Sequence, residues 1–239
     1  GAEPPAFAGF IGQSSAMQEI YRMVRAIGRS TATVFITGES GTGKEVCARA
    51  IHGVSNRARR PFVPLNCAAI PRDLLESEVF GHLKGAFTGA LSDKPGAAAV
   101  ADGGTLFLDE ICEMDLSLQT KLLRFLQTST IQPVGAARPI PVDVRIVCAT
   151  NRDPAEEVRQ GRFREDLYYR LSAATLTLPP LRAREDFDWL AGRMLAGQGG
   201  LALSPAAAAR LRAHAWPGNL RELANVVAVA AALSEGGVI

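Results

Sequence analysis

The chain has 239 residues, of which 47% are apolar, and a formal net charge of +2 at neutral pH. This length suits one large domain, or one large and one small, and folding should bury roughly 70–75% of the unfolded surface. The charge balance is too weak to predict nucleic-acid binding from the electric field of the protein. No apolar run reaches the roughly 18 residues of a membrane-spanning helix, so we expect no membrane segment.

The four cysteines are Cys47, Cys67, Cys112 and Cys148. None forms a CxxC pair, and no histidine lies at metal-ligand spacing from them. Most of them lie in apolar runs, which predicts buried, reduced thiols in a cytoplasmic protein. The three histidines, His52, His82 and His214, are interpreted as structural or solvated.

Short apolar runs alternate with helical patterns over most of the chain. The expected strands are 33–37, 61–66, 104–110, 144–150 and 174–179, and the expected helices are 15–27, 43–53, 71–80, 115–128 and 154–160. The apolar runs are continuous rather than alternating, which is typical of parallel strands covered on both faces. This order predicts an α/β domain with a doubly wound, five-stranded parallel sheet, whose ligands bind beyond the carboxyl ends of the strands.

The pattern changes after residue 180. Helical candidates follow at 184–197, 204–214 and 218–233, with no strand between them. Ser204 followed by Pro205 is typical of a helix start, with serine as N-cap and proline at the first helical position. We therefore expect an α/β domain over 1–180 and a small all-α domain over 181–239.

The string GESGTGKE follows an apolar strand and opens a helix. Its residues are Gly38, Glu39, Ser40, Gly41, Thr42, Gly43, Lys44 and Glu45, which we call the phosphate loop. In this context the backbone N–H groups of a glycine-rich loop converge on phosphate oxygens, and the lysine supplies a positive charge. A glycine-rich turn without a ligand is the alternative, and the combination of strand, loop, lysine and helix favours nucleotide binding.

Glu45 stands where the general motif has the serine or threonine that holds Mg²⁺. A carboxylate in the first helical turn suits the helix dipole. It could also hold Mg²⁺ through water, because this ion often keeps several waters. The residues leave both roles open.

A second acidic element, GGTLFLDE, ends a buried strand with Asp109 and Glu110. We expect this strand to be adjacent to the one before the phosphate loop, which would place both carboxylates beside that loop. Asp109 suits Mg²⁺, directly or through water, and Glu110 suits activation of the attacking water. An ordinary acidic strand end is the alternative. A module that only binds nucleotide would not need Glu110, so its presence favours hydrolysis.

The segment 81–96, GHLKGAFTGALSDKPG, places Phe87 between Gly85 and Gly89. We call it the arm. Glycines free the backbone, so the ring is not expected inside a helix or strand. The ring either folds back onto the core or serves as an anchor for a partner.

The phosphate loop, the acidic pair and the GAFTGA string together resemble the central AAA+ ATPase domain of bacterial, NtrC-like activators of sigma-54 RNA polymerase. The resemblance runs from FIGQSSAM to WPGNLRELANVV. It implies that a loop made of Gly85, Ala86, Phe87, Thr88, Gly89 and Ala90 moves with the nucleotide state. Phe87 and Thr88 would contact the sigma factor. Glu45 is usual in this family.

The resemblance also places a second mobile loop at 131–141, where Pro133 replaces a residue that is basic in many relatives. Asn66 resembles the residue that holds the catalytic glutamate away from water, and a strand-end turn bond is the alternative. Thr150 and Asn151 resemble the sensor of the γ-phosphate, and loop capping is the alternative.

Arg164 and Arg170 resemble arginine fingers supplied by a neighbouring subunit. The alternative is an ion pair of an arginine with Glu165 or Asp166 on a solvated helix. Arg221 resembles the lid arginine that reaches the nucleotide. The alternative is a surface arginine on the last helix with no such role. Ile11 and Gly12 are expected in the adenine pocket.

The resemblance implies an ATPase that uses ATP and Mg²⁺ in a ring, expected to be a hexamer, in the bacterial cytoplasm. It would remodel the closed sigma-54 promoter complex into the open one. The alternative is an AAA+ ATPase that remodels another protein, but such a machine has no reason for GAFTGA. A binding module without turnover would not need Glu110, and a DNA-binding factor does not suit a nearly neutral chain. We expect promoter DNA to be bound mainly through a domain absent here.

Overall fold

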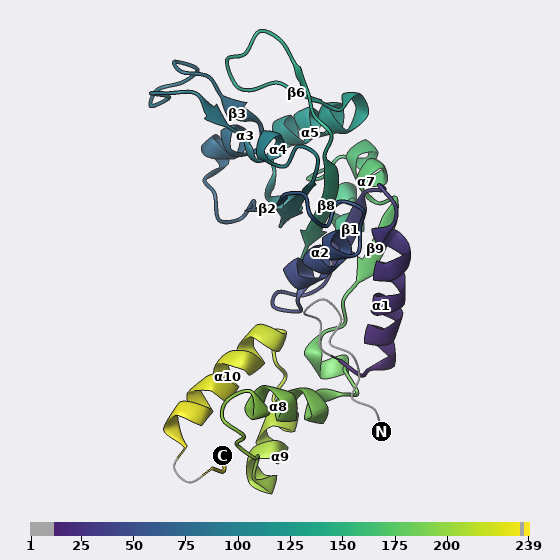
Figure 1. Ribbon diagram of the computed structural model, residues 1–239, viewed down its shortest axis with the longest axis vertical. Helices are drawn as coiled ribbons and strands as arrows, with labels where there is room; N and C mark the ends of the chain where they lie inside the picture. The colour runs from purple at the N-terminus through teal and green to yellow at the C-terminus, as the bar shows by residue number, and fades with distance from the viewer. Residues whose placement is uncertain (1–11, 235–236) are drawn as a thin grey trace.

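The computed structural model describes residues 12–234 and 237–239 (Figure 1). Five strands form a parallel sheet in the order β2, β5, β8, β1, β9. In chain order the strands are β1 (Val34–Thr37), β2 (Phe62–Asn66), β5 (Thr105–Asp109), β8 (Arg145–Thr150) and β9 (Ala174–Thr177). The predicted sheet is confirmed, and each strand lies within two residues of its expected bounds.

Helices cover both faces of the sheet, because successive strand residues point to opposite sides. The helices α1 (Ser15–Gly28) and α2 (Lys44–Gly53) cover one face, and α3 (Arg72–Phe80), α5 (Leu116–Thr128) and α7 (Glu165–Leu171) cover the other. Val34 and Ile36 of β1 pack in the hydrophobic core under α1 and α2. Phe35, which lies between them, packs in the core on the opposite face, under α3, α5 and α7. The short helices α4 (Ala97–Val100) and α6 (Pro154–Arg159) complete this part.

Two small antiparallel ribbons leave the sheet at the end opposite the C-terminal helices (Figure 1). One pairs β3 (Gly81–His82) with β4 (Lys94–Pro95) and forms the base of the arm. The other pairs β6 (Thr130–Ile131) with β7 (Ile140–Pro141) and carries the loop between them. These four short strands are not among those expected from the sequence.

Three helices form the lid, a separate group below the sheet in Figure 1. They are α8 (Phe187–Ala196), α9 (Pro205–Ala213) and α10 (Asn219–Leu233), and the 3₁₀ turn η2 (Leu181–Ala183) precedes them. Ser204 caps α9 by accepting the Ala207 N–H, and Pro205 is its first residue, as predicted. Buried Trp216, Leu223 and Leu190 form the centre of the lid core.

All four cysteines are buried and unpaired by disulfides. Burial raises the pKa of the Cys47 and Cys67 thiols to about 12, which makes them poor nucleophiles. None of the helices in the described ranges is long and apolar enough to cross a membrane.

Candidate nucleotide-binding site

The phosphate loop turns from the end of β1 into α2 through two glycines in the left-handed region. Gly41 has a φ of 81° and Gly43 a φ of 99°. A Cβ atom on Gly41 would lie 2.2 Å from the Gly218 carbonyl oxygen at the start of α10. Glycine is therefore required here both for the backbone turn and for the close approach of the lid.

Lys44 begins α2 and is almost fully buried. Its Nζ donates to the carbonyl oxygens of Gly38, at 2.9 Å, and Glu39, at 3.0 Å. Glu110 Oε1 lies 4.0 Å away. Burial lowers the pKa of Lys44, and the nearby carboxylates of Glu110 and Asp109 oppose that shift. The ammonium group thus sits between the loop carbonyls and an acidic pair.

Asp109 ends β5 and Glu110 follows it, but the expectation that β5 neighbours β1 is wrong. The strand β8 lies between them and pairs with both. The two carboxylates still reach the phosphate loop, because the carboxyl ends of all three parallel strands meet at one edge. Strand order depends on pairings between segments distant in sequence, so the local pattern could not reveal it.

The backbone turns sharply at Glu110, which has a φ of 53°. This conformation is costly for a residue with a side chain and clusters at functional sites. The Glu110 Oε2 atom accepts the Asn151 N–H at 3.2 Å, and Asp109 Oδ1 accepts the Glu110 N–H at 3.0 Å. Burial raises the pKa of both carboxyl groups, against the pull of Lys44.

The carboxylates suit Mg²⁺ only in combination with phosphate oxygens. Across residues 12–234 and 237–239, no group of three or more metal-ligating side chains forms a site alone. Mg²⁺ commonly takes one or two carboxylates, several waters and substrate phosphates, and Asp109 fits that pattern. Glu45 lines the same cleft but pairs with Arg49 at 2.9 Å, one helical turn on.

Asn66 ends β2 opposite Asp109 in the sheet register. Its Oδ1 accepts the Ala68 N–H at 3.0 Å, which is the predicted alternative of a strand-end turn bond. Thr150, at the end of β8, accepts the Arg152 N–H at 3.1 Å, which is the predicted loop cap. Asn66 and Asn151 both line the cleft, whereas the switching and sensing roles stay predictions.

The lid closes one side of the cleft, whose volume is about 650 Å³. The lining residues are Ser40, Gly41, Gly43, Lys44, Glu45, Val46, Asn66, Ala68, Asp109, Glu110, Glu113 and Asn151 from the sheet domain, and Met194, Leu220, Arg221 and Ala224 from the lid. The Arg221 N–H donates to the Gly41 carbonyl at 3.3 Å. The structure therefore brings together most of the predicted site residues.

Not all predicted catalytic and nucleotide-binding residues line the cleft. Those that adjoin lining residues without lining it themselves are Gly38, Glu39, Thr42 and Thr150. Four others lie elsewhere or outside the described residues. Ile11 lies outside the described residues. Gly12 is buried against Arg184, whose Nη2 would lie 2.4 Å from an added Cβ, and it does not line the cleft. Arg164 and Arg170 lie around α7, also away from the cleft of their own chain.

Arg164 forms the predicted alternative, a two-point ion pair with Asp166 at 2.8 and 3.0 Å. It also donates to Thr120 Oγ1 at 2.8 Å. Arg170 is exposed, and its Nη2 donates to the Leu126 carbonyl at 3.3 Å.

The arm has few attachments. Gly85 and Gly89 have φ values of 80° and 97°, and a Cβ on either would meet open space. The Gly85 N–H donates to the Ala90 carbonyl at 2.8 Å. Phe87 is 36% exposed, and its ring packs edge-on against His82 at 4.9 Å. The ring thus rests on the base of the arm rather than in the core.

The arm is joined to the loop between β6 and β7. The Leu83 N–H donates to the Val134 carbonyl at 3.0 Å, and the Val134 N–H donates to the Gly81 carbonyl at 2.9 Å. Val134 lies in the predicted second loop over 131–141, but no local signal in the sequence marks its pairing with the arm.

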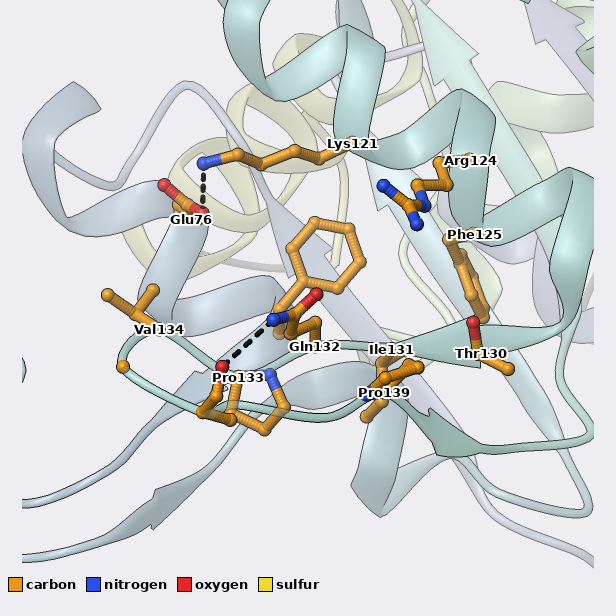
Figure 2. A pocket seen from close by; sticks show the side chains of 13 residues that line it. Glu76, Lys121, Arg124, Phe125, Thr130, Ile131, Gln132, Pro133, Val134 and Pro139 are labelled. Carbon is orange, nitrogen blue, oxygen red and sulfur yellow. Dashed lines mark hydrogen bonds and ion pairs between the residues drawn. The ribbon is translucent and has the colours of Figure 1, made fainter.

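The loop between β6 and β7 also covers a second cavity of about 410 Å³ between α3 and α5 (Figure 2). In Figure 2 Lys121 pairs with Glu76 across its mouth.

Comparison with known proteins gives two matching families. The family model for the Sigma-54 interaction domain matches residues 10–177, and that for the AAA+ ATPase lid domain matches residues 185–239. The regulatory protein LuxO of Vibrio cholerae is 58% identical over 237 residues, which are 96% of this chain and 52% of LuxO. The response regulator protein FleR of Pseudomonas aeruginosa is 51% identical and covers 97% of this chain and 50% of FleR.

The crystal structure of NtrX from Brucella abortus in complex with ATP superposes with a TM-score of 0.87. It is 37% identical and covers 95% of this chain and 54% of the NtrX chain. The chain thus spans about half the length of the curated relatives that it matches. Because the first model matches well over half of the chain, the chain belongs to the sigma-54 interaction domain family and has the AAA+ P-loop fold with an AAA+ lid domain.

Proposed function

We propose that this chain hydrolyses ATP in a ring oligomer and uses the energy to remodel the closed sigma-54 promoter complex into the open one. The observation that carries the proposal is the convergence of Lys44, Asp109, Glu110 and the lid residue Arg221 on one cleft. The same chain carries the GAFTGA string in an exposed arm. The domain boundary is proposed near residue 180, between the last sheet strand and the lid.

ATP phosphates would lie against the phosphate loop and the start of α2, where helix N–H groups favour anions. Lys44 would exchange its bonds to the loop carbonyls for bonds to phosphate oxygens. Glu110 would take the proton of the attacking water, and its raised pKa makes it a better base than an ordinary glutamate. Mg²⁺, held by Asp109 with Glu45 nearby, would neutralise charge that develops on the phosphates.

Two arginines of a neighbouring copy would complete the site. Arg164 and Arg170 lie away from their own cleft, and a finger supplied in trans stabilises transition-state charge. This arrangement makes hydrolysis depend on a ring, for which we propose a hexamer. Hydrolysis would alter the contact of Glu110 with the backbone of Asn151 and the position of Asn66.

The arm would transmit that change to sigma-54 through Phe87 and Thr88, both of which are exposed. Its glycine joints and few hydrogen bonds make movement inexpensive relative to the packed sheet. Promoter DNA would be bound mainly through a domain outside this chain. We place the protein in the bacterial cytoplasm, within a two-component system, as the name of FleR indicates for that relative.

Open-complex formation on a sigma-54 promoter tests this function. ATP with the wild-type chain, fused to the flanking domains of the full-length protein, should open the promoter, and Lys44→Ala should not. Opening with a polymerase that carries another sigma factor serves as the control for specificity. ATP hydrolysis without any opening would instead favour an AAA+ ATPase that remodels a different protein.

A further inference from the structure

Glu39, the second residue of the phosphate loop, does not line the cleft. Its carboxylate points to Arg182 of η2, which donates from Nη1 at 2.8 Å and from Nη2 at 2.5 Å. Arg182 belongs to the segment that connects the sheet domain to the lid. A two-point pair of this kind fixes orientation as well as distance.

Asn219 joins the same carboxylate from the lid side. It is fully buried at the first position of α10 and has a φ of 52°. Its amide nitrogen donates to Glu39 Oε2 at 3.1 Å and to the Ser40 carbonyl at 3.0 Å. Its Oδ1 accepts the Leu181 N–H at 2.8 Å. One buried side chain therefore ties the phosphate loop, the connecting segment and the lid together.

This cluster lies next to two further contacts between the phosphate-loop backbone and the lid. Gly41 touches Gly218, and the Arg221 N–H donates to Gly41. Arg221 lies two residues after Asn219 on the same helix, so the angle at which α10 leaves Asn219 decides where Arg221 points. The cluster thus has the geometry to set the distance between the lid and the phosphate loop.

We propose that Glu39 is a positioning residue that holds the lid against the phosphate loop and thereby sets the affinity for nucleotide. This inference rests on the proposed function, since it takes the cleft to bind ATP. Glu39 acts through Arg182 and Asn219 and touches no reacting atom. Its loss is expected to weaken binding of ATP and to leave the rate of hydrolysis at saturating ATP largely intact.

The charge of the Glu39 carboxylate supports a contact with Arg182 and Asn219 that persists at every pH near neutrality. Hydrogen bonds from Arg182 and Asn219 lower the pKa of Glu39 to about 2. The carboxylate therefore stays ionised throughout the neutral range, and the cluster is not a pH switch. Because Glu39 and Arg182 are only half shielded, the ion pair alone contributes little to folding stability. Its effect should appear in the position of the lid and in the binding of nucleotide.

A double-mutant cycle on nucleotide affinity tests this proposal. Binding of a fluorescent ATP analogue is titrated on the wild type, Glu39→Ala, Arg182→Ala and the double variant. Each single change should weaken binding by about 5- to 20-fold, in the lower part of the roughly 5- to 150-fold range typical of coupled sites. The double variant should bind about as weakly as the weaker single variant, because both changes break one contact. Glu39→Gln, which keeps an acceptor for Asn219, should lose less than Glu39→Ala.

The exposed pair Glu19–Arg22 on α1 provides the matched control. Glu19→Ala removes a surface ion pair far from the cleft and should bind the analogue like the wild type. A rise in KM without a matching fall in kcat separates loss of positioning from loss of chemistry. Thermal melting confirms that each variant is folded. If Glu39→Ala does not fold, Arg182→Ala tests the same contact, because Arg182 is exposed and its replacement should not disturb the core.

Three results would overturn the proposal. Unchanged affinity in Glu39→Ala and Arg182→Ala, with normal binding by the wild type, would contradict this inference alone. Full additivity of the two changes would show that they do not act through one contact. Failure of the wild type to bind the analogue would overturn the proposed function, and this inference with it.

Discussion

The nucleotide cleft and the arm are held in place by different kinds of contact. The carboxylates of the cleft follow a strand whose side chains Leu106, Phe107 and Leu108 are at most 1% exposed. The arm is held by two short strands, several backbone hydrogen bonds and the ring contact between Phe87 and His82. A few polar side-chain contacts add to these, including those of the Lys84 N–H with Asp93 and of Lys94 with Glu78. Local opening of the arm therefore costs far less free energy than any displacement of the cleft.

Under the proposed function, this difference assigns ATP hydrolysis to the rigid cleft and transmission of movement to the arm. Groups that stabilise charge must stay fixed during the reaction, and a packed sheet provides that rigidity. A segment that pushes on a partner must move, and glycine joints with few contacts permit movement. Substitutions in the cleft should therefore abolish ATP hydrolysis, whereas substitutions in the arm should act on the partner.

The largest effect is expected from Arg170→Ala. If the finger acts in trans, its removal should lower ATP turnover by roughly 10³-fold or more. A mixture of Arg170→Ala with Lys44→Ala should recover part of the turnover, because each copy supplies the group that the other lacks. Measured phosphate release that stays at the level of the separate variants would contradict the shared site. Arg164→Ala, tested in the same way, shows which arginine carries the effect.

The next effect concerns the base. Glu110→Gln should lower ATP turnover by about 10²- to 10⁴-fold, since general-base catalysis contributes in that range. Binding of ATP should remain, because Lys44 and the phosphate loop are untouched. Single-turnover hydrolysis and equilibrium binding are measured on the same samples. Equal loss of binding and turnover would show that Glu110 holds the cleft together instead.

A substitution in the arm should affect open-complex formation and ATP turnover to different degrees. Thr88→Ala should reduce sigma-54-dependent open-complex formation far more than it reduces ATP turnover, because Thr88 is exposed and distant from the cleft. The two activities are measured in one reaction with the same nucleotide. A parallel decline of both would mean that the arm contributes to hydrolysis rather than to transmission.

The smallest effect concerns pH. Burial raises the pKa of Glu110 above its ordinary value of 4.5, so the base becomes protonated at a higher pH than an exposed glutamate. ATP turnover should therefore decline as the pH falls through that raised pKa, before the fold is lost. The pH dependence of kcat, with circular dichroism as the check on folding, measures it. A decline that appears only together with unfolding would show that Glu110 does not limit the rate.

Much of the sheet domain follows from local pattern. Buried apolar runs fixed the strands to within two residues, and the GESGTGKE string located Lys44 at the start of α2. What the sequence could not reveal depends on partners distant in the chain. The position of β8 between β1 and β5 arises from strand pairing, and Glu39 meets Arg182 across a separation of 143 residues. The short ribbons at the arm escaped prediction because two-residue strands carry no periodic signal.

Binding of sigma-54 in different nucleotide states tests the central claim most directly. The chain is incubated with purified sigma-54 and either ADP or a transition-state mimic of ATP, and the bound fraction is measured by pull-down. We predict strong retention with the mimic, weak retention with ADP, and loss of the difference in Phe87→Ala. Equal retention in both states would contradict the account, because the arm would then be insensitive to the chemistry in the cleft.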